Sequence, residues 1–186
     1  MGGISRRGLI VMGGATLGLA ACGNGIGSDG ATTLDARADE SRAFLLSRYP
    51  DTQALIDSSA GVLWVPLMTE AAFGIGGGAF GRGVLRIRDA TVDYYSATQA
   101  QIGLQIGAQQ YSHALFFRTD EALADFRASN GWALGADAKY ASPEGGASLG
   151  ADTTTTLDPV VALVYGQSGL IVGASLEGTK YTRIIP

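Results

Sequence analysis

The stretch FGIGGGAFGRGVL, residues 73–85, places glycines at alternate positions of an apolar segment that otherwise reads as a β-strand. Gly74, Gly76 and Gly78 would share one face of that strand, because successive side chains of a strand point to opposite faces. Glycine inside a strand usually marks a bend or the close approach of another backbone. We therefore expect a strongly curved antiparallel sheet, barrel-like, whose tight interior admits only small residues.

Further pairs of glycines lie at wider, near-alternate spacing, at Gly103 and Gly107 and at Gly173 and Gly178. Most of the chain after Gly61 alternates between apolar and polar residues, which is the pattern of half-buried strands. The sequence therefore predicts an α+β fold that is mostly β. The expected strands are residues 62–65 (closed by Pro66), 71–81, 83–88, 91–97, 102–109, 111–118, 132–140, 147–152, 160–165 and 170–176, with a hairpin turn at residues 167–169.

Helices are expected at two places beside the sheet. The first begins at Leu34 and buries a stripe that repeats at helical spacing: Leu34, Ala38, Ser41, Leu45 and Tyr49. A short helix over residues 51–59 follows it. The second place is an inserted helix near residues 120–129, with Thr119 or Asp120 as its cap and Leu123 and Phe126 on its buried side.

Composition and charge exclude several classes of protein. The chain has 186 residues, of which 46% are hydrophobic and 16% are charged, so it can bury a core and is not disordered throughout. The formal net charge is −4, and loss of residues 1–21, which hold two arginines and no acidic residue, would leave 11 basic against 17 acidic residues, or −6. Such a surface repels nucleic acid, so we do not expect nucleic-acid binding.

The N-terminus has the features of a lipoprotein signal peptide, residues 1–21. Arg6 and Arg7 form its positive region, and an apolar stretch too short to span a bilayer follows. Leu19, Ala20 and Ala21 then precede Cys22 as in a lipobox, so Cys22 is the expected lipid-attachment residue. Residues 22–33 would form a flexible tether and residues 34–186 the domain. Two acyl chains on the new N-terminus would give stable attachment to a phospholipid membrane.

The route of export has two interpretations. The segment Ser5-Arg6-Arg7-Gly8-Leu9-Ile10 resembles a twin-arginine signal, whereas an ordinary Sec signal can also carry two adjacent arginines. Gly23 stands where an acidic retention residue could have followed Cys22. We therefore expect an exported protein anchored in the bacterial cell envelope, at the periplasmic face of the outer membrane.

The sequence contains two catalytic-type motifs, but neither has the neighbouring elements or residues that its function requires. Residues 76–81 fit G-x-G-x-x-G, but a strand rather than a helix should follow, so nucleotide binding is not expected. Residues 146–150 fit G-x-S-x-G around Ser148, but no histidine follows it. The single histidine, His113, is interpreted as a half-buried strand residue. We expect no cofactor, no metal site and no enzyme.

The order of the Gly-rich segments resembles the SYLF domain family over residues 35–183. The matching stretches are GVLWVP (61–66), FGIGGGAFGRGVL (73–85), IGLQIGAQ (102–109), the helix 120–127, LGADA (134–138) and GLIVGASLEG (169–178). The resemblance implies a noncatalytic module that associates with phospholipid and, in eukaryotic members, with actin. Actin is not a periplasmic partner, so actin binding is not expected here.

Two functions from different classes follow. The first is a lipid-binding, membrane-associated envelope lipoprotein, with Arg82, Arg86 and Arg88 as candidate lipid head-group contacts because Arg86 and Arg88 should share one strand face. The alternative reading of these arginines is an edge strand protected by charge. The alternative function is a periplasmic scaffold or stress-related protein that binds another protein through its sheet edges.

Overall fold

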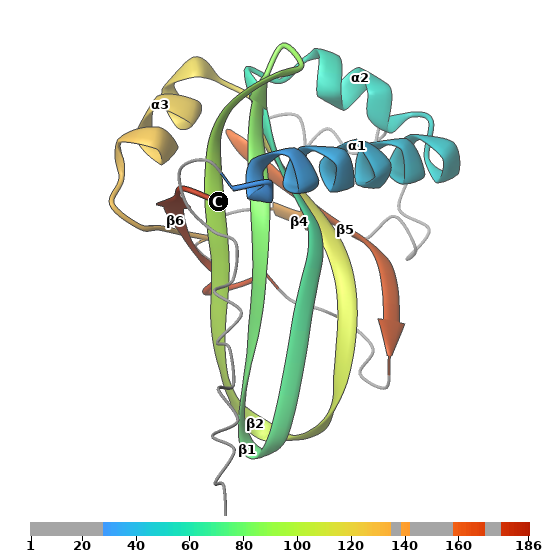
Figure 1. Ribbon diagram of the computed structural model, residues 1–186, viewed down its shortest axis with the longest axis vertical. Helices are drawn as coiled ribbons and strands as arrows, with labels where there is room; N and C mark the ends of the chain where they lie inside the picture. Colours follow the sequence, from blue (N-terminus) through green and yellow to red (C-terminus); the bar gives the residue numbers. More distant parts are fainter. Residues whose placement is uncertain (1–27, 135–138, 142–157, 170–175) are drawn as a thin grey trace, which may run out of the picture.

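The computed structural model describes residues 28–134, 139–141, 158–169 and 176–186 (Figure 1). Within these ranges the fold is α+β and mostly β, as predicted. The helices are α1 (Gly30–Arg48), α2 (Thr52–Asp57) and α3 (Asp120–Ala128). The strands are β1 (Gly61–Ile87), β2 (Ala90–Phe117), β3 (Trp132–Ala133), β4 (Lys139–Ala141), β5 (Val160–Gly169) and β6 (Lys180–Ile184).

A long two-stranded ribbon, bent in its middle, forms the body of the fold. β1 and β2 are antiparallel partners along almost their whole lengths, from Gly61 opposite Phe117 to Ile87 opposite Ala90. Figure 1 shows both strands running to the lower end of the molecule and turning back there. The bend falls at Gly74, whose φ is +69°, beside a register shift between Gly74 and Gly76. Glycine adopts this backbone conformation without steric cost.

The bend brings the two halves of β1 against each other, and glycine makes the contact possible. A Cβ added to Gly77 would lie 2.7 Å from Cβ of Ala72, and one added to Gly81 would lie 2.7 Å from the carbonyl oxygen of Leu67. Atoms this close leave no room for a side chain. The prediction of a curved sheet with a tight interior is therefore confirmed, and the neighbour is the same strand. The predicted glycines were wrong, because a Cβ added to Gly74 or Gly76 would meet nothing within 4 Å, whereas Gly77, Gly81 and Gly83 make the close contacts.

The other strands line the free side of β2. β6 pairs with residues 94–98 of β2 and β5 with residues 109–117, both antiparallel. β3 pairs with β6, and β4 pairs with β5 in the parallel sense. In the described part of the chain the strand order is β3-β6-β2-β5-β4, with β1 on the other side of β2. This path does not return to its start, so the described sheet is curved but open.

Two hydrophobic clusters lie on opposite faces of the sheet. One contains Leu34, Ala38 and Leu45 of α1 packed against Trp64 and Phe116. The other contains Leu123 and Phe126 of α3 with alternate residues of the strands, such as Leu63 and Tyr95. The predicted buried stripe of the first helix is confirmed at Leu34, Ala38, Ser41 and Leu45, while Tyr49 is partly buried against the same cluster.

The inserted helix is also confirmed. α3 spans Asp120–Ala128, and the Thr119 hydroxyl caps it by accepting a hydrogen bond from the Ala122 amide at 3.1 Å. Leu123 and Phe126 are its buried residues, as the sequence indicated.

Several predicted element boundaries were wrong. Helix α1 begins at Gly30, not Leu34, and the Ser28 hydroxyl accepts a hydrogen bond from the Gly30 amide. Pro66 does not close a strand, because β1 passes it through a register shift between Val65 and Met68 that requires no donor from proline.

The hairpin turn expected at residues 167–169 is absent, since β5 continues through them with Ser168 opposite Gln110. The left-handed φ of Gly166, +64°, accompanies a bulge there instead. β6 was not expected at all. The strand predicted at residues 147–152 and most of the one at 170–176 lie outside the described residues.

Candidate membrane-binding site

Four large apolar side chains project into solvent where the β1–β2 ribbon bends. We call Phe73, Ile75, Ile102 and Ile106 the apolar tip. Their exposed fractions are 85%, 76%, 97% and 77%, so each makes little contact with the rest of the protein. Phe73 of β1 lies directly opposite Ile106 of β2, and Gly76 lies opposite Ile102. The apolar tip is therefore one cluster at one end of the molecule, the lower end in Figure 1.

The local sequence explains why these residues face outward. Gly77 and Gly81 line the inner surface of the bend, where the two halves of β1 meet and exclude side chains. Within the described ranges, residues on the other side of the bend have no such neighbour, so their side chains extend into water. Phe80, 54% exposed, extends the apolar surface along β1. Contiguous exposed apolar side chains on a soluble domain mark a surface that meets a membrane or a partner.

The apolar tip also lacks charge. Residues 71–81 and 94–117 contain no Lys, Arg, Asp or Glu. Charged side chains resist transfer into hydrocarbon, whereas Phe and Ile favour it. The ladder between β1 and β2 continues on both sides of the bend, so many backbone polar groups near the tip already have partners.

The three arginines predicted as head-group contacts do not form a shared exposed face. Arg86 is buried, with a side chain 10% exposed, and it pairs with carboxylates of α1. Arg82 is partly buried within β1, opposite Ser96. Arg88 is exposed, but it lies in the β1–β2 turn with φ +50° and not on a strand face. The register shift between Leu85 and Arg86 and the turn at Arg88 break the alternation on which that prediction relied.

Arg86 holds α1 onto the sheet. Its Nη1 donates a hydrogen bond to Oδ1 of Asp39, and its Nη2 donates to the carbonyl oxygen of Asp35 at 3.2 Å. The hydrogen bond from Arg86 holds the pKa of Asp39 below its ordinary value. Oδ1 and Oδ2 of Asp35 accept hydrogen bonds from Thr91 at 2.8 Å and Tyr94 at 2.9 Å. Arg86 therefore has a structural role, and its contacts explain its burial.

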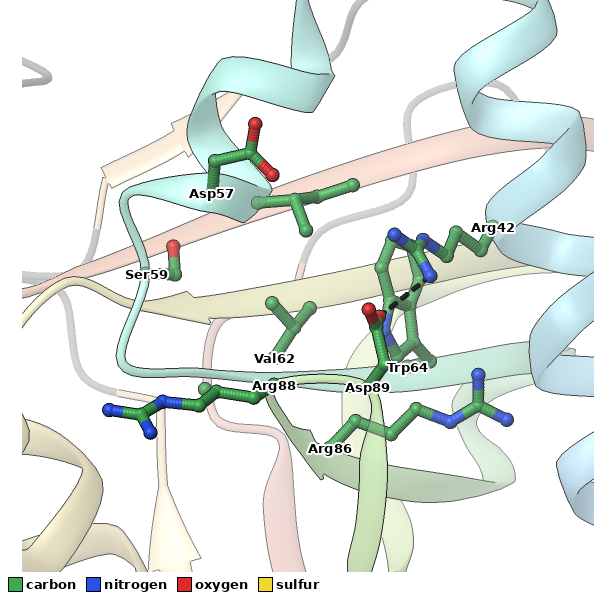
Figure 2. Close-up of a pocket in the computed structure, with 10 residues that line it drawn as sticks. Arg42, Asp57, Ser59, Val62, Trp64, Arg86, Arg88 and Asp89 are labelled. Atoms are coloured by element: carbon green, nitrogen blue, oxygen red, sulfur yellow. Dashed lines mark hydrogen bonds and ion pairs between the residues drawn. The ribbon is translucent and has the colours of Figure 1, made fainter.

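A cavity of about 250 Å³ lies beside the contacts of Arg86 with Asp35 and Asp39. It lies between α1, the α2–β1 connection and the β1–β2 turn. Its charged lining residues are Arg42, Asp57, Arg86, Arg88 and Asp89. Figure 2 shows that the side chains of Arg86 and Arg88 extend in opposite directions, while Arg42 is joined to Asp89. That ion pair measures 2.7 Å. Since the guanidinium groups do not converge and carboxylates accompany them, the cavity is not a preformed anion site.

His113 is fully buried, not half-buried as predicted, and its Nε2 lies 2.9 Å from the hydroxyl of Tyr181. Burial lowers the pKa of His113 to about 3, so the imidazole is neutral. Residues 76–81, which fit the dinucleotide motif, lie within β1, and the chain continues as strand after them. Ser148 lies outside the described residues.

Among the described residues, no group of three or more His, Cys, Asp or Glu side chains could hold a metal ion. No helix in that part of the chain is long and apolar enough to cross a membrane. Cys22 and the signal residues Arg6, Arg7, Leu19, Ala20 and Ala21 lie outside the described ranges, so lipid attachment there stays a prediction.

A Gly-rich bent ribbon, packed helices and an exposed apolar end define a β-rich α+β domain as the class of this protein. Residues 98–183 match the family model of Ysc84, described as "Las17-binding protein actin regulator". This match begins within β2 and ends within β6, and it confirms over that segment the resemblance to the SYLF family seen in the sequence. The family is one of lipid- and actin-binding modules. No curated protein matches the chain at significant similarity.

Sequence reasoning missed the apolar tip. The signal was present, because Phe73 and Ile75 alternate with the glycines of β1 in a stretch without charge. If one face of a bent strand is too crowded for side chains, its large residues must occupy the outer face. The sequence did not show that this outer face would be left uncovered.

Proposed function

We propose that this protein is a noncatalytic, lipid-binding envelope lipoprotein whose domain contacts the phospholipid bilayer through the apolar tip. The observation that carries this proposal is the exposure of four large apolar side chains at one uncharged end of the fold. The SYLF domain supports it, since lipid binding is an activity of that family. The signal features and Cys22 supply the acyl anchor and the envelope location.

The size of the apolar tip suits reversible binding. Full transfer of one large apolar side chain from water to an apolar environment contributes roughly 1.5–3 kcal/mol. Four such side chains, only partly inserted, give enough free energy to hold a domain at a membrane that an acyl anchor already keeps close. They do not approach the insertion energy of a transmembrane helix.

The position of the arginines argues against head-group binding as the main contact. The β1–β2 turn with Arg88 lies with α1 and α2 at the upper end of Figure 1, whereas the bend lies at the lower end. About 13 residues of strand separate these ends, or about 40 Å at ~3.3 Å per residue. A bilayer that receives the apolar tip is therefore out of reach of Arg86 and Arg88.

Liposome flotation tests the proposal. The protein would be the mature chain from residue 22 carrying Cys22→Ser, so that no acyl chain is attached. We expect it to float with phosphatidylethanolamine–phosphatidylglycerol liposomes, and to do so equally in low and high salt because the tip carries no charge. In the double variant Phe73→Ser, Ile102→Gln the floated fraction should fall at least fivefold. The matched surface variant Thr32→Ser, Arg37→Gln should float like the parent.

Flotation that disappears in high salt and survives the tip substitutions would overturn the role of the apolar tip. Failure of the parent to float under any condition would leave only the acyl anchor as a membrane contact.

One observation favours the scaffold alternative. Within the described residues β1 pairs with β2 alone, so its other edge carries no strand partner. An unpaired edge can accept a strand from another protein. A chain that does not bind liposomes but captures an extended peptide along β1 would support that function.

A further inference from the structure

The apolar tip has its shape before it meets a membrane. Its side chains stand on two strands that stay paired on both sides of the bend, with Ala72 opposite Gly107 and Gly77 opposite Gln101. The left-handed φ of Gly74, +69°, sets the direction of the chain at the bend. Strands held by such cross-strand pairs do not refold to suit a surface. The membrane must therefore offer a gap into which the tip already fits.

The charged residues nearest to the tip in β1 do not reach its outer surface. Glu70 is 2% exposed and lies two residues before Ala72, whose side chain lines the inside of the bend. Its Oε2 accepts a hydrogen bond from Nε2 of Gln109 at 2.7 Å. Arg82 lies six residues beyond Gly76, or about 20 Å along the strand at ~3.3 Å per residue. In the described part of the ribbon, the surface offered to a membrane thus carries no charge that would select a lipid head group.

The free edge of β1 limits how deep the tip can go. Among the described strands, only β2 pairs with β1, so the backbone N–H and C=O groups along the other edge of β1 have no strand partner. Hydrocarbon offers such groups no hydrogen bond, and open sheet edges do not occur in it. The backbone of the ribbon must therefore stay among the head groups, and only the side chains of the apolar tip reach the acyl chains. Such shallow insertion, about 5–10 Å, is typical of apolar elements that lie at a membrane surface.

We propose that the apolar tip recognises loose packing of a bilayer and not a particular head group. It binds where acyl chains are accessible between head groups, as on strongly curved membranes or among cone-shaped lipids. The inference rests on the proposed function, and it adds which membranes the domain prefers.

The three observations lead to this preference together. A shallow apolar element gains free energy only where it contacts acyl chains, and binding of this kind is sensitive to curvature and lipid composition. A preformed tip cannot spread over a tightly packed surface to gain more contact. Without charge on the tip, no electrostatic attraction compensates for the missing gaps.

The experiment compares vesicles of one composition and two sizes. The protein is the mature chain from residue 22 carrying Cys22→Ser, so that no acyl chain adds to binding. Dioleoylphosphatidylcholine vesicles of about 30 nm and about 200 nm diameter present strongly curved and nearly flat surfaces of the same chemistry. Flotation at equal accessible lipid measures the bound fraction.

We expect the floated fraction to be at least about fivefold larger with the small vesicles, because their outer leaflet leaves acyl chains accessible between head groups. Adding the cone-shaped lipid dioleoylphosphatidylethanolamine to the large vesicles should raise the fraction as well. Replacing a fifth of the phosphatidylcholine in the small vesicles by anionic phosphatidylglycerol should change it less than about twofold, since the tip carries no charge.

Substitutions locate the preference. The double variant Phe73→Ser, Ile102→Gln should bind small vesicles no better than large ones. The matched control is Val92→Thr, Ile185→Gln, which removes two apolar side chains that are 38% and 66% exposed. Val92 lies near the β1–β2 turn, and Ile185 follows the pair of Ile184 with Tyr94, so both are far from the bend. The control should keep the preference of the parent. Circular dichroism confirms that each variant is folded.

The outcomes separate this inference from the proposed function. Equal flotation with small and large vesicles, still lost in the tip variant, would overturn the recognition of loose packing and leave the membrane function standing. Flotation that follows the phosphatidylglycerol content and not the vesicle size would overturn it in favour of head-group binding. A parent chain that floats with none of these vesicles, nor with those of phosphatidylethanolamine and phosphatidylglycerol, would show that both proposals are wrong.

Discussion

The backbone of Gly83 packs directly on Trp64: a Cβ added to Gly83 would lie 2.8 Å from the Trp64 carbonyl oxygen. It would also lie 2.7 Å from Cγ2 of Val65. A backbone carbonyl oxygen held in a paired strand cannot move aside as a flexible side chain can. The two halves of β1 therefore approach as closely as they do only because position 83 has no side chain.

Gly83→Ala should lower the free energy of unfolding by about 1–3 kcal/mol, the usual cost of forcing an extra carbon into a packed interior. Urea denaturation followed by circular dichroism measures it. Gly76→Ala is the matched control, because a Cβ at Gly76 meets nothing within 4 Å and its φ is not in the left-handed region. Equal destabilisation by both variants would contradict the close packing of β1 on itself.

Arg86→Gln should lower the urea midpoint at neutral pH, since it breaks the ion pair that holds α1 to the sheet. The pKa of Asp39 is lowered from 3.8 in the folded state, so the stabilisation is present above that value and is lost as pH falls through the folded pKa. The difference between wild type and variant should therefore shrink in acid. Arg37→Gln is the control, because Arg37 is exposed and lies on α1 with Asp39. This variant should have the same stability as wild type at every pH.

The chain has a single histidine, so its imidazole gives one NMR titration curve. Burial lowers the pKa of His113 to about 3, and the signal of the folded protein should not shift between pH 8 and 4.5. The unfolded chain takes up a proton below 6.5, the ordinary pKa, and the folded chain does not, so stability falls as pH drops from 6.5 toward 3. His113→Gln should lack this decline. A folded-state titration near 6.5 would show that the imidazole is in water.

Substitutions at the apolar tip should leave stability unchanged, which separates their effect on membranes from an effect on folding. Ile102 is 97% exposed, so Ile102→Gln should change the free energy of unfolding by no more than about 0.5 kcal/mol. Leu63→Ala, at a fully buried residue, should cost about 2–5 kcal/mol. Thermal denaturation compares the two. A large loss from Ile102→Gln would mean that the tip is packed.

The glycine pattern predicted that β1 has a crowded inner face, but it assigned the wrong glycines to that face. Gly77, Gly81 and Gly83 make the close contacts, whereas a Cβ added to Gly74 or Gly76 would meet nothing within 4 Å. The pattern did not identify the neighbouring backbone. Alternation shows that one face of β1 must be flat, but the same pattern suits contact with any strand. That the second half of β1 covers its own first half depends on the bend at Gly74, where a single glycine changes the direction of the whole ribbon.

The candidate site was harder to predict for two physical reasons. Arg86 and Arg88 seemed to share a face under strict alternation, and a one-residue shift in register reverses every later side chain. The carboxylates that pair with Arg86 belong to a helix about fifty residues earlier, at Asp35 and Asp39. The apolar tip was missed because large apolar residues in a strand are expected in the core, and only the bend exposes Phe73 and Ile75.

The two-residue turn at Arg88 and Asp89 has a consequence for how the chain folds. β1 and β2 are neighbours in sequence there, and each pair farther from the turn closes a longer loop. Pairing of β1 with β2 can therefore begin at Ile87 and Ala90 and proceed residue by residue past the bend. The last pair to form is Gly61 and Phe117, beside the strand residues on which α1 packs. The segment that forms the apolar tip is paired midway, before either helix-covered face is complete. A chain stalled at that stage would expose its future core together with its tip.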